Sequence, residues 1–216
     1  MKEMAAQAMI EGLHWVYDRV LAQKPSISAG GAGPRDETAV IRWAVAQAGL
    51  VGFTTGLGGA FTLPILLPVN VAGVSAIQIH MVQEIARIRG YDLGSAQVRT
   101  LTIGCLAGGA VIDALKTAGI SAGTALTRTM LLQLSGAALA AVNRTVGTKL
   151  AARAGVMNVG KFVPVVGGLI GGAVDGASTA AIGAVAKRVF VADTPLPAVA
   201  PPGPLLLEQP YLEHGV

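Results

Sequence analysis

Apolar side chains recur at helical spacing through most of the chain and predict a series of α-helices. The first helix is expected at residues 2–23, where Trp15 and Tyr17 flank an apolar face. The side chains on that face are Met9, Leu13, Val16, Val20 and Leu21. A loop rich in Pro, Ser and Gly is expected at 24–34, ahead of a much longer apolar stretch.

That stretch runs from Trp43 to Gln83 and contains 41 residues without a charged side chain. It is too long for one membrane span, which takes about 20 apolar residues. Glycine and proline interrupt its middle, at Gly56, Gly58, Gly59, Pro64 and Pro68. We therefore expect a helical hairpin, with a first helix at about 37–57, capped by Asp36, and a second helix beginning at about Pro68.

The second helix of this hairpin has two different faces. One face is polar and carries His80, Gln83, Glu84 and Arg87. The other is apolar and carries Val74, Ile77, Met81, Ile85 and Ile88. A helix with such a polar face does not read as a simple membrane span, so we interpret the charge-free run as half of an interlocking helical core. Gly90 is expected to end the helix.

Further helices are expected at about 95–117, capped by Asp92 or Ser95, and at 120–134 and 135–154. Residues 162–186 repeat the apolar pattern, with small residues at every fourth position. These residues are Gly168, Gly172, Gly176 and Ala180. Such a ladder lets another helix approach closely, as do Gly49, Gly52 and Gly56. Two apolar hairpins, at about 43–89 and 156–187, are expected to pack together.

The predicted fold is therefore all-α, a compact bundle of about six to eight helices with two Gly/Pro-rich hairpins. Residues 1–190 form one domain, and the Pro-rich segment 191–216 is expected to be a disordered tail. Charged residues make up 13% of the chain, against about 25% in typical soluble domains. The mean hydropathy is +0.60. With 29 glycines and few aromatic residues, this composition favours close helix packing through small side chains.

The location suggested by the sequence is the cytoplasm. A single cysteine, Cys105, excludes an intramolecular disulfide, and its apolar surroundings favour a buried, inert thiol. Four charges cross the N-terminal apolar segment, which is therefore not a signal peptide. These charges are Glu3, Glu11, Asp18 and Arg19.

The net charge of +4 is unevenly distributed. No acid lies between Asp113 and Asp175, whereas six basic residues do. They are Lys116, Arg128, Arg144, Lys149, Arg153 and Lys161. A basic, apolar segment suits an anionic membrane surface better than nucleic acid, which calls for denser basic residues and stacking aromatics. A plain solvated helix face is the alternative.

Little in the sequence points to catalysis, a metal or a cofactor. Residues 155–161 fit the G-x4-G-K opening of a phosphate-binding loop, but Phe162 replaces the hydroxyl residue that would hold Mg²⁺. His14, His80 and His214 are dispersed, and the one i, i+4 pair of His80 with Glu84 is insufficient for a metal site on its own. Asp113 and Asp175 each interrupt an apolar helix, where structural ion pairs with the basic residues between them are expected.

Several blocks together resemble the EcsC family of bacterial proteins. They are a G-x-G-G…LP…P block from Gly56, the helix Q-x-x-M-V-x-x-I-A from Gln78, the GYD-L turn at 90–93, and K-x-V-P-V-V-G-G-x-x-G-G from Lys161 with its following acid. The resemblance covers about 10–190. It implies an all-helical bacterial protein near membranes, in a family named after an operon that also encodes an ABC transporter. It implies no catalytic residues.

Three hypotheses for function follow. The first is a non-enzymatic helical protein that associates peripherally with the cytoplasmic membrane or a membrane complex, with Arg144, Lys149, Arg153 and Lys161 attracted to anionic lipid. The second is a soluble adaptor or cargo protein whose C-terminal tail docks onto a larger assembly or shell. The third is an enzyme or a lipid-binding pocket that uses Asp175 or His80.

Overall fold

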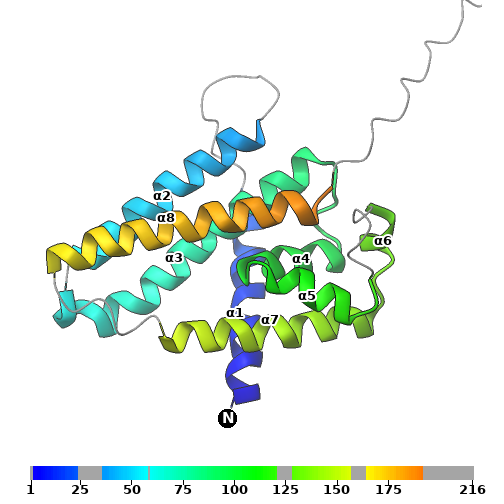
Figure 1. The fold of residues 1–216 in the computed structure, drawn as a ribbon, viewed down its shortest axis with the longest axis horizontal. Coiled ribbons are helices and arrows are strands. Elements are labelled where there is room, and N and C mark those ends of the chain that lie inside the picture. Colours follow the sequence, from blue (N-terminus) through cyan, green and yellow to red (C-terminus); the bar gives the residue numbers. More distant parts are fainter. Residues whose placement is uncertain (1, 24–35, 58, 121–127, 157–163, 192–216) are drawn as a thin grey trace, which may run out of the picture.

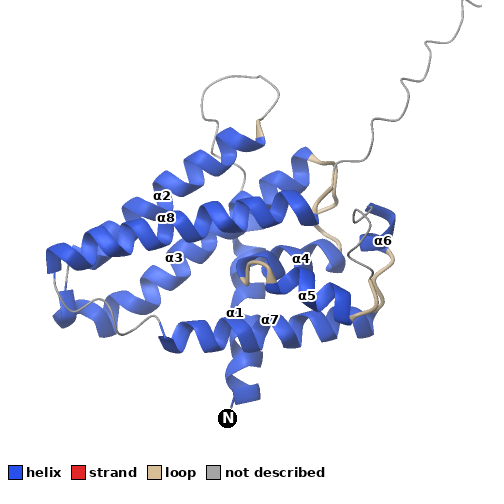
Figure 2. Cartoon of the chain, in the orientation of Figure 1, coloured by secondary structure: helices blue, strands red, loops and turns tan. Residues whose placement is uncertain are grey.

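The computed structural model describes residues 2–23, 36–57, 59–120, 128–156 and 164–191, and for residues 2, 59–71, 153–156 and 164–167 it describes the backbone only. Eight helices and no strand occur within these ranges (Figure 2), so the predicted all-α fold is confirmed. The predicted loop at 24–34 and the tail from 192 onward lie outside the described residues, as does most of the phosphate-loop-like segment. The helices are α1 (Lys2–Ala22), α2 (Glu37–Leu57), α3 (Gly59–Ile88), α4 (Ala96–Leu106), α5 (Ala110–Thr117), α6 (Arg128–Leu132), α7 (Gly136–Val156) and α8 (Pro164–Val189).

The helices form two regions of the molecule. Helices α2, α3 and α8 run side by side toward one end, beyond the ends of α1, α4 and α5 (Figure 1). We call residues 43–57, 59–77 and 164–186 of these helices the arm. The remaining helices, together with the second half of α3, form the body, in which α1 packs against α3, α4 and α7.

Helix α1 buries a stripe of side chains against the body. The stripe follows the spacing of one helix face and consists of Ala6, Ile10, Leu13, Tyr17 and Val20. Tyr17, which was expected on a flank, is fully buried. Its buried hydroxyl is satisfied by a hydrogen bond that it donates to the carbonyl of Leu93 at 2.7 Å. Trp15 is exposed.

The predicted hairpin is present, but its second helix starts earlier than expected. Helix α2 has the predicted bounds, and the Asp36 carboxylate accepts a hydrogen bond from the Thr38 amide at 3.0 Å. Helix α3 begins at Gly59, whereas the sequence predicted a start at about Pro68. The helix continues through Pro64 and Pro68 without their two backbone hydrogen bonds. Packing against α2 and α8 accounts for the helical path of this segment.

Two residues of the polar face of α3 turn inward, whereas Arg87 on the same face is exposed. Gln83 and Glu84 are buried, since the Gln83 amide donates to the carbonyl of Tyr17 at 3.3 Å and Glu84 pairs with Arg87. Gly90 ends the helix as predicted, with φ at +75°. The Tyr91 amide then donates back to the carbonyl of Ala86, which closes the C-terminal cap.

The single helix predicted at 95–117 is two helices. Ser95 caps α4 as one of the two predicted candidates, and its hydroxyl accepts from the Val98 amide. The break follows from Gly108, whose φ of +67° cannot continue a right-handed helix. The described part of the helix expected at 120–134 is the short α6, whereas α7 agrees with the helix expected at 135–154.

The second expected hairpin is also different in the structure. The described part of this predicted hairpin, from residue 164 onward, is the single helix α8. The glycine ladder does not break α8, because the ladder lies in a packed interface with α2. Ala180, the last position of the predicted ladder, is exposed. A step of four residues drifts around a helix of 3.6 residues per turn, so the fourth position of the ladder leaves the packed face.

Candidate functional site

Helices α2 and α8 approach each other through facing glycines, and this contact shapes the arm. A Cβ added to Gly52 would lie 2.6 Å from the Gly171 carbonyl oxygen and 2.4 Å from Asp175 Oδ2. One added to Gly172 would lie 2.8 Å from the Gly49 oxygen, and one on Gly168 3.1 Å from the Phe53 oxygen. Gly176 is in ordinary contact with α2, at 3.7 Å from Val45. The small residues therefore occupy the packed faces of both helices.

Other large apolar side chains of α2 and α8 remain exposed, although one of them, Leu57, also packs against Gly168. On α2, Trp43, Leu50 and Leu57 recur every seven residues and are 49%, 63% and 44% exposed. On α8, Leu169 and Ile170 are 62% and 45% exposed. We call the exposed side chains of the two helices within the arm the apolar face. They are Trp43, Ala46, Leu50, Thr54, Leu57, Leu169, Ile170, Ala173, Val174, Ala177, Ala180, Ala181 and Ala184.

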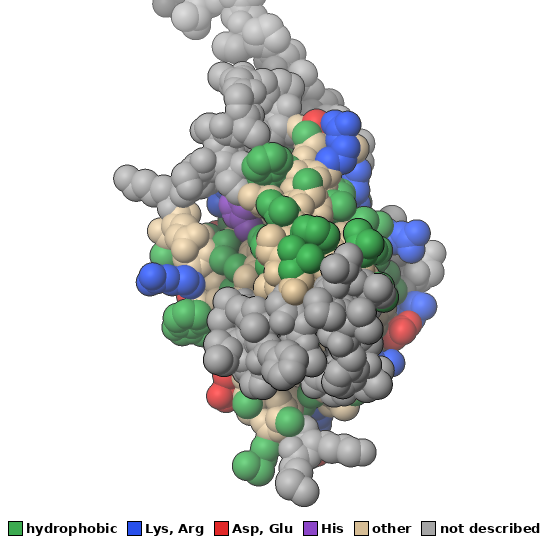
Figure 3. All heavy atoms as spheres, turned by 90° about the vertical axis from the view of Figure 1, so that its left-hand side faces the viewer, with side chains coloured by type: hydrophobic (Ala, Val, Ile, Leu, Met, Phe, Trp, Pro, Cys, Tyr) green, Lys and Arg blue, Asp and Glu red, His purple; other side chains and the backbone are tan. Residues whose placement is uncertain are grey.

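The apolar face lacks the charges that an exposed helix face of a soluble protein normally carries. Its one polar member, Thr54, donates its hydroxyl hydrogen to the carbonyl of Val51 at 3.0 Å. The three segments of the arm contain one charged residue, Asp175, which is buried. Figure 3 looks at the end of the arm and shows hydrophobic side chains gathered beside the undescribed residues, with Lys and Arg toward the outline. Exposed apolar surfaces occur at contacts with lipid and at contacts with other proteins.

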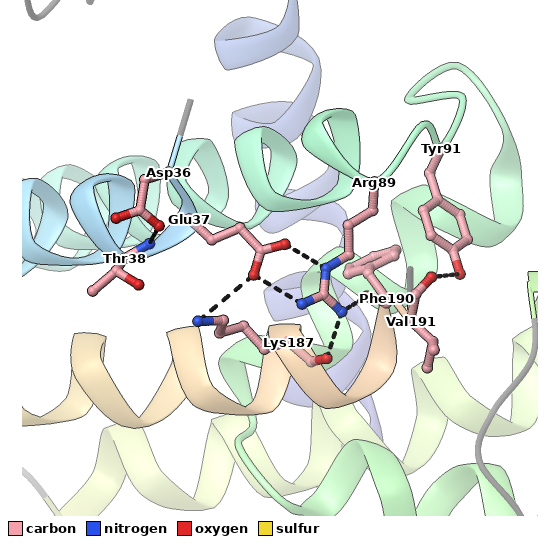
Figure 4. Close-up of polar contacts among 8 residues, drawn as sticks. All are labelled: Asp36, Glu37, Thr38, Arg89, Tyr91, Lys187, Phe190 and Val191. Atoms are coloured by element: carbon pink, nitrogen blue, oxygen red, sulfur yellow. Dashed lines mark hydrogen bonds and ion pairs between the residues drawn. The ribbon is translucent and has the colours of Figure 1, made fainter. Parts of the chain in front are cut away.

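Charged groups gather instead where the arm meets the body (Figure 4). Arg89 forms a bidentate pair with Glu37, at 2.5 Å from Nε to Oε1 and 2.8 Å from Nη2 to Oε2. Lys187 Nζ lies 3.6 Å from the same carboxylate. The Arg89 hydrogen bond, which outweighs the effect of burial, lowers the pKa of Glu37. The backbone amide of Thr38 likewise lowers the pKa of Asp36.

The same arginine closes the end of α8. Arg89 Nη1 donates to the carbonyl oxygens of Lys187, at 2.8 Å, and of Phe190. The Tyr91 hydroxyl donates to the carbonyl of Val191 at 3.1 Å, and the Tyr91 and Phe190 rings meet edge to face. These contacts join the start of α2, the end of α3 and the end of α8 at the base of the arm.

Two of the four basic residues predicted to contact a membrane have described side chains, and these two lie on α7, outside the apolar face. Arg144 and Lys149 are exposed on α7, which packs against α1, α4 and α5. The Arg153 side chain and Lys161 lie outside the described parts of the structure. At the base of the arm, on the two helices of the apolar face, the described basic residues are Arg42, Lys187 and Arg188.

A family model for the EcsC protein family matches residues 27–191 of the chain. The chain belongs to the EcsC family. No match was found among curated proteins or among solved structures. The matched region includes α2 to α8, so the arm and the whole apolar face belong to the EcsC domain, whereas α1 precedes it.

Among the described residues of this EcsC domain, one helix is long and apolar enough to cross a membrane by its length and composition. It is the Gly168–Val189 stretch of α8, with a mean hydropathy of 1.4 in its best window, of which 39% is buried. A core helix of a soluble protein passes the same test, so this property alone carries little weight. The chemical character of the exposed side of α8 is the more specific observation.

Buried polar side chains of the EcsC domain form hydrogen bonds between α3 and α8. Gln78 donates to Thr179 Oγ1 at 3.1 Å, and the Thr179 hydroxyl donates to the carbonyl of Asp175 at 2.7 Å. Gln78 thus links α3 to α8 beside Asp175. Asp113 is exposed on α5, whereas Asp175 is buried. Within the described ranges, no three His, Cys, Asp or Glu side chains gather as a metal site requires.

In the body, burial shifts the pKa of several side chains. Burial raises the pKa of Tyr17 to about 12, and burial together with Arg99 lowers the pKa of His14. Arg99 lies over the Tyr17 ring and pairs with Asp18. Burial also raises the pKa of the Cys105 thiol, which agrees with the predicted inert character.

Sequence reasoning missed Trp43, Leu50 and Leu57 as an exposed set. Hydropathy alone does not separate the two sides of a uniformly apolar helix. The available signal was the spacing, because these side chains recur every seven residues opposite Gly49, Gly52 and Gly56. In a glycine-rich apolar helix the glycines mark the packed side, so the bulky residues across from them face outward.

Proposed function

We propose that this EcsC protein is a non-enzymatic helical protein that associates peripherally and reversibly with the cytoplasmic face of the cell membrane. The apolar face of α2 and α8 is the observation that carries the proposal. Six large side chains on it are more than two-fifths exposed, and no charge lies among them. Each such side chain transferred from water to lipid contributes about 1 kcal/mol or more, according to the apolar area it still exposes.

The apolar face is more stable in contact with lipid than with water, because acyl chains need no hydrogen-bonding partner on the protein. The face offers methyl and aromatic groups, and its Thr54 hydroxyl is already bonded within α2. A protein partner would be expected to meet a polar rim around an apolar centre. Here the charged groups of the described residues lie at one end of the face, around Glu37 and Arg89, which suits a membrane with its apolar interior and charged headgroups.

Flotation with liposomes tests the proposal. The protein should float with vesicles of phosphatidylglycerol and phosphatidylcholine at low salt. Leu50→Glu should weaken binding at least tenfold, because it places a charge in the centre of the apolar face. Leu132→Glu is the matched control, since Leu132 is 41% exposed on α6, away from the arm, and should bind as the unchanged protein does.

Two results would count against membrane association. The first is no flotation with either anionic or neutral vesicles at low salt. The second is equal loss of binding in Leu50→Glu and Leu132→Glu, which would show that any new charge on the surface suffices. Circular dichroism of both variants establishes that they remain folded.

A further inference from the structure

The absence of charge extends around the arm and is not confined to its apolar face. The part of α3 in the arm, residues 59–77, also has no charged residue, and α3 packs against both α2 and α8. A helix pair lying flat on a membrane needs only one apolar side, and its far side normally carries charges in water. The arm therefore suits an apolar environment on more than one side.

The buried position of Asp175 also suits an apolar environment around the arm. Asp175 is 4% exposed and lies between α8 and Gly52 of α2. Ionisable residues within membranes characteristically face the protein interior and not the lipid. Lys161, the nearest basic residue before α8 in the sequence, lies outside the described residues.

We propose that the arm enters an anionic phospholipid leaflet end-on, to the depth of a collar formed by Arg42, Trp43, Lys187 and Arg188. This inference rests on the proposed membrane association and adds its orientation, its depth and its lipid preference. The collar combines basic side chains, which contact anionic headgroups, with a tryptophan, which favours the membrane interface.

The charges at the collar favour an anionic surface. The described charged residues there are Arg42, Arg89, Lys187 and Arg188, against Asp36 and Glu37, which leaves a net charge of 4 − 2 = +2. Glu37 is occupied by Arg89 and Lys187. Arg42 and Arg188 are exposed and lie at the ends of α2 and α8 that meet at the base.

Three exposed residues on α2 mark successive positions along the arm, and we call these three residues the ruler. Trp43, Leu50 and Leu57 share one face at intervals of seven residues, which is about 10 Å along a helix for each interval. If the arm enters end-on, Leu57 lies deepest, about 20 Å below Trp43 along the helix axis. If α2 and α8 lie flat on the surface, all three residues occupy the same depth.

Depth-dependent fluorescence quenching distinguishes these two orientations. The chain has two tryptophans, and Trp15 lies on α1, so the variant Trp15→Phe leaves Trp43 as a single probe. Adding Trp43→Phe with either Leu50→Trp or Leu57→Trp moves the probe along the ruler. Each protein is bound to phosphatidylglycerol and phosphatidylcholine vesicles that carry bromine either near the headgroup or near the end of the acyl chain.

The expected result is a graded change in the quencher that acts best. Headgroup bromine should quench Trp43 most, and chain-end bromine should quench a tryptophan at position 57 most, with position 50 between them. Equal quenching patterns at the three positions in proteins that float would overturn end-on insertion but leave membrane association standing. No flotation of any of these proteins would remove both.

A second experiment tests the collar. Arg42→Gln with Arg188→Gln should weaken binding to anionic vesicles about 25-fold, at about fivefold for each charge removed. Arg144→Gln with Lys149→Gln removes two exposed charges from α7 and is the matched control, with little expected effect. A larger loss in the α7 variant than in the collar variant would overturn the assignment of the collar.

Discussion

Gly52 shows how a single position decides the spacing of the arm. Its Cα faces the backbone of Gly171 and the carboxylate of Asp175, at distances that leave no room for a methyl group. The nearest atoms include backbone, which yields less readily than the end of a flexible side chain. The close contact of α2 and α8, and with it the outward orientation of the large side chains, depends on such positions.

Gly52→Ala should therefore destabilise the protein by about 1–3 kcal/mol, through overpacking against α8. Gly12→Ala on α1 is the control, because no atom lies within 4 Å of the added Cβ. That change should stabilise the protein by up to about 1 kcal/mol, since alanine favours a helix more than glycine does. Chemical denaturation followed by circular dichroism measures both. Equal stabilities of the two variants would contradict the close contact.

At the scale of elements, three helix ends meet at the pair of Glu37 and Arg89. Their side chains are 17% and 14% exposed, so solvent screens the pair less than it screens a surface ion pair. Arg89 also holds the last carbonyl groups of α8. Loss of the carboxylate would leave the guanidinium with a poorer set of partners at a half-buried site.

The lowered pKa of Glu37 gives the pair a pH dependence. Its contribution to stability is present above the ordinary pKa of 4.5 and is lost as the pH falls through the lowered value in the folded protein. Glu37→Gln should cost about 2 kcal/mol at neutral pH. The variant should also lose less stability on acidification, and urea denaturation at neutral and acidic pH measures both effects. An unchanged slope against pH would show that the pair contributes nothing.

The sequence predicts the ends of some helices better than those of others, because capping residues are visible in the sequence and tertiary packing is not. Helix α2 has both ends predicted, because Asp36 caps it and Gly58 and Gly59 follow it. The start of α3 is missed, since local propensity stops a helix at Pro64 and Pro68 whereas packing continues it. The break at Gly108 is missed because a glycine in an apolar helix and a glycine in a turn look alike in sequence.

At the scale of the whole molecule, the sequence predicts the apolar character of the arm but not the surface it presents. The run without charge and the glycine ladders are visible directly, as is the basic bias between Asp113 and Asp175. Which basic residues lie near the arm depends on the tertiary arrangement. Arg144 and Lys149 are distant from it on α7, whereas Arg42 and Arg188 lie at its base although 146 positions separate them.

The rate at which Cys105 is labelled measures how fast the body opens. It is fully buried in α4, and the raised pKa keeps its thiol protonated and unreactive. A thiol reagent should therefore label the native protein only as fast as the body opens. If the arm enters lipid while the body stays folded, vesicles should leave that labelling rate unchanged. Rapid labelling on addition of vesicles would instead mean that lipid unfolds the body, and mass spectrometry resolves the two outcomes.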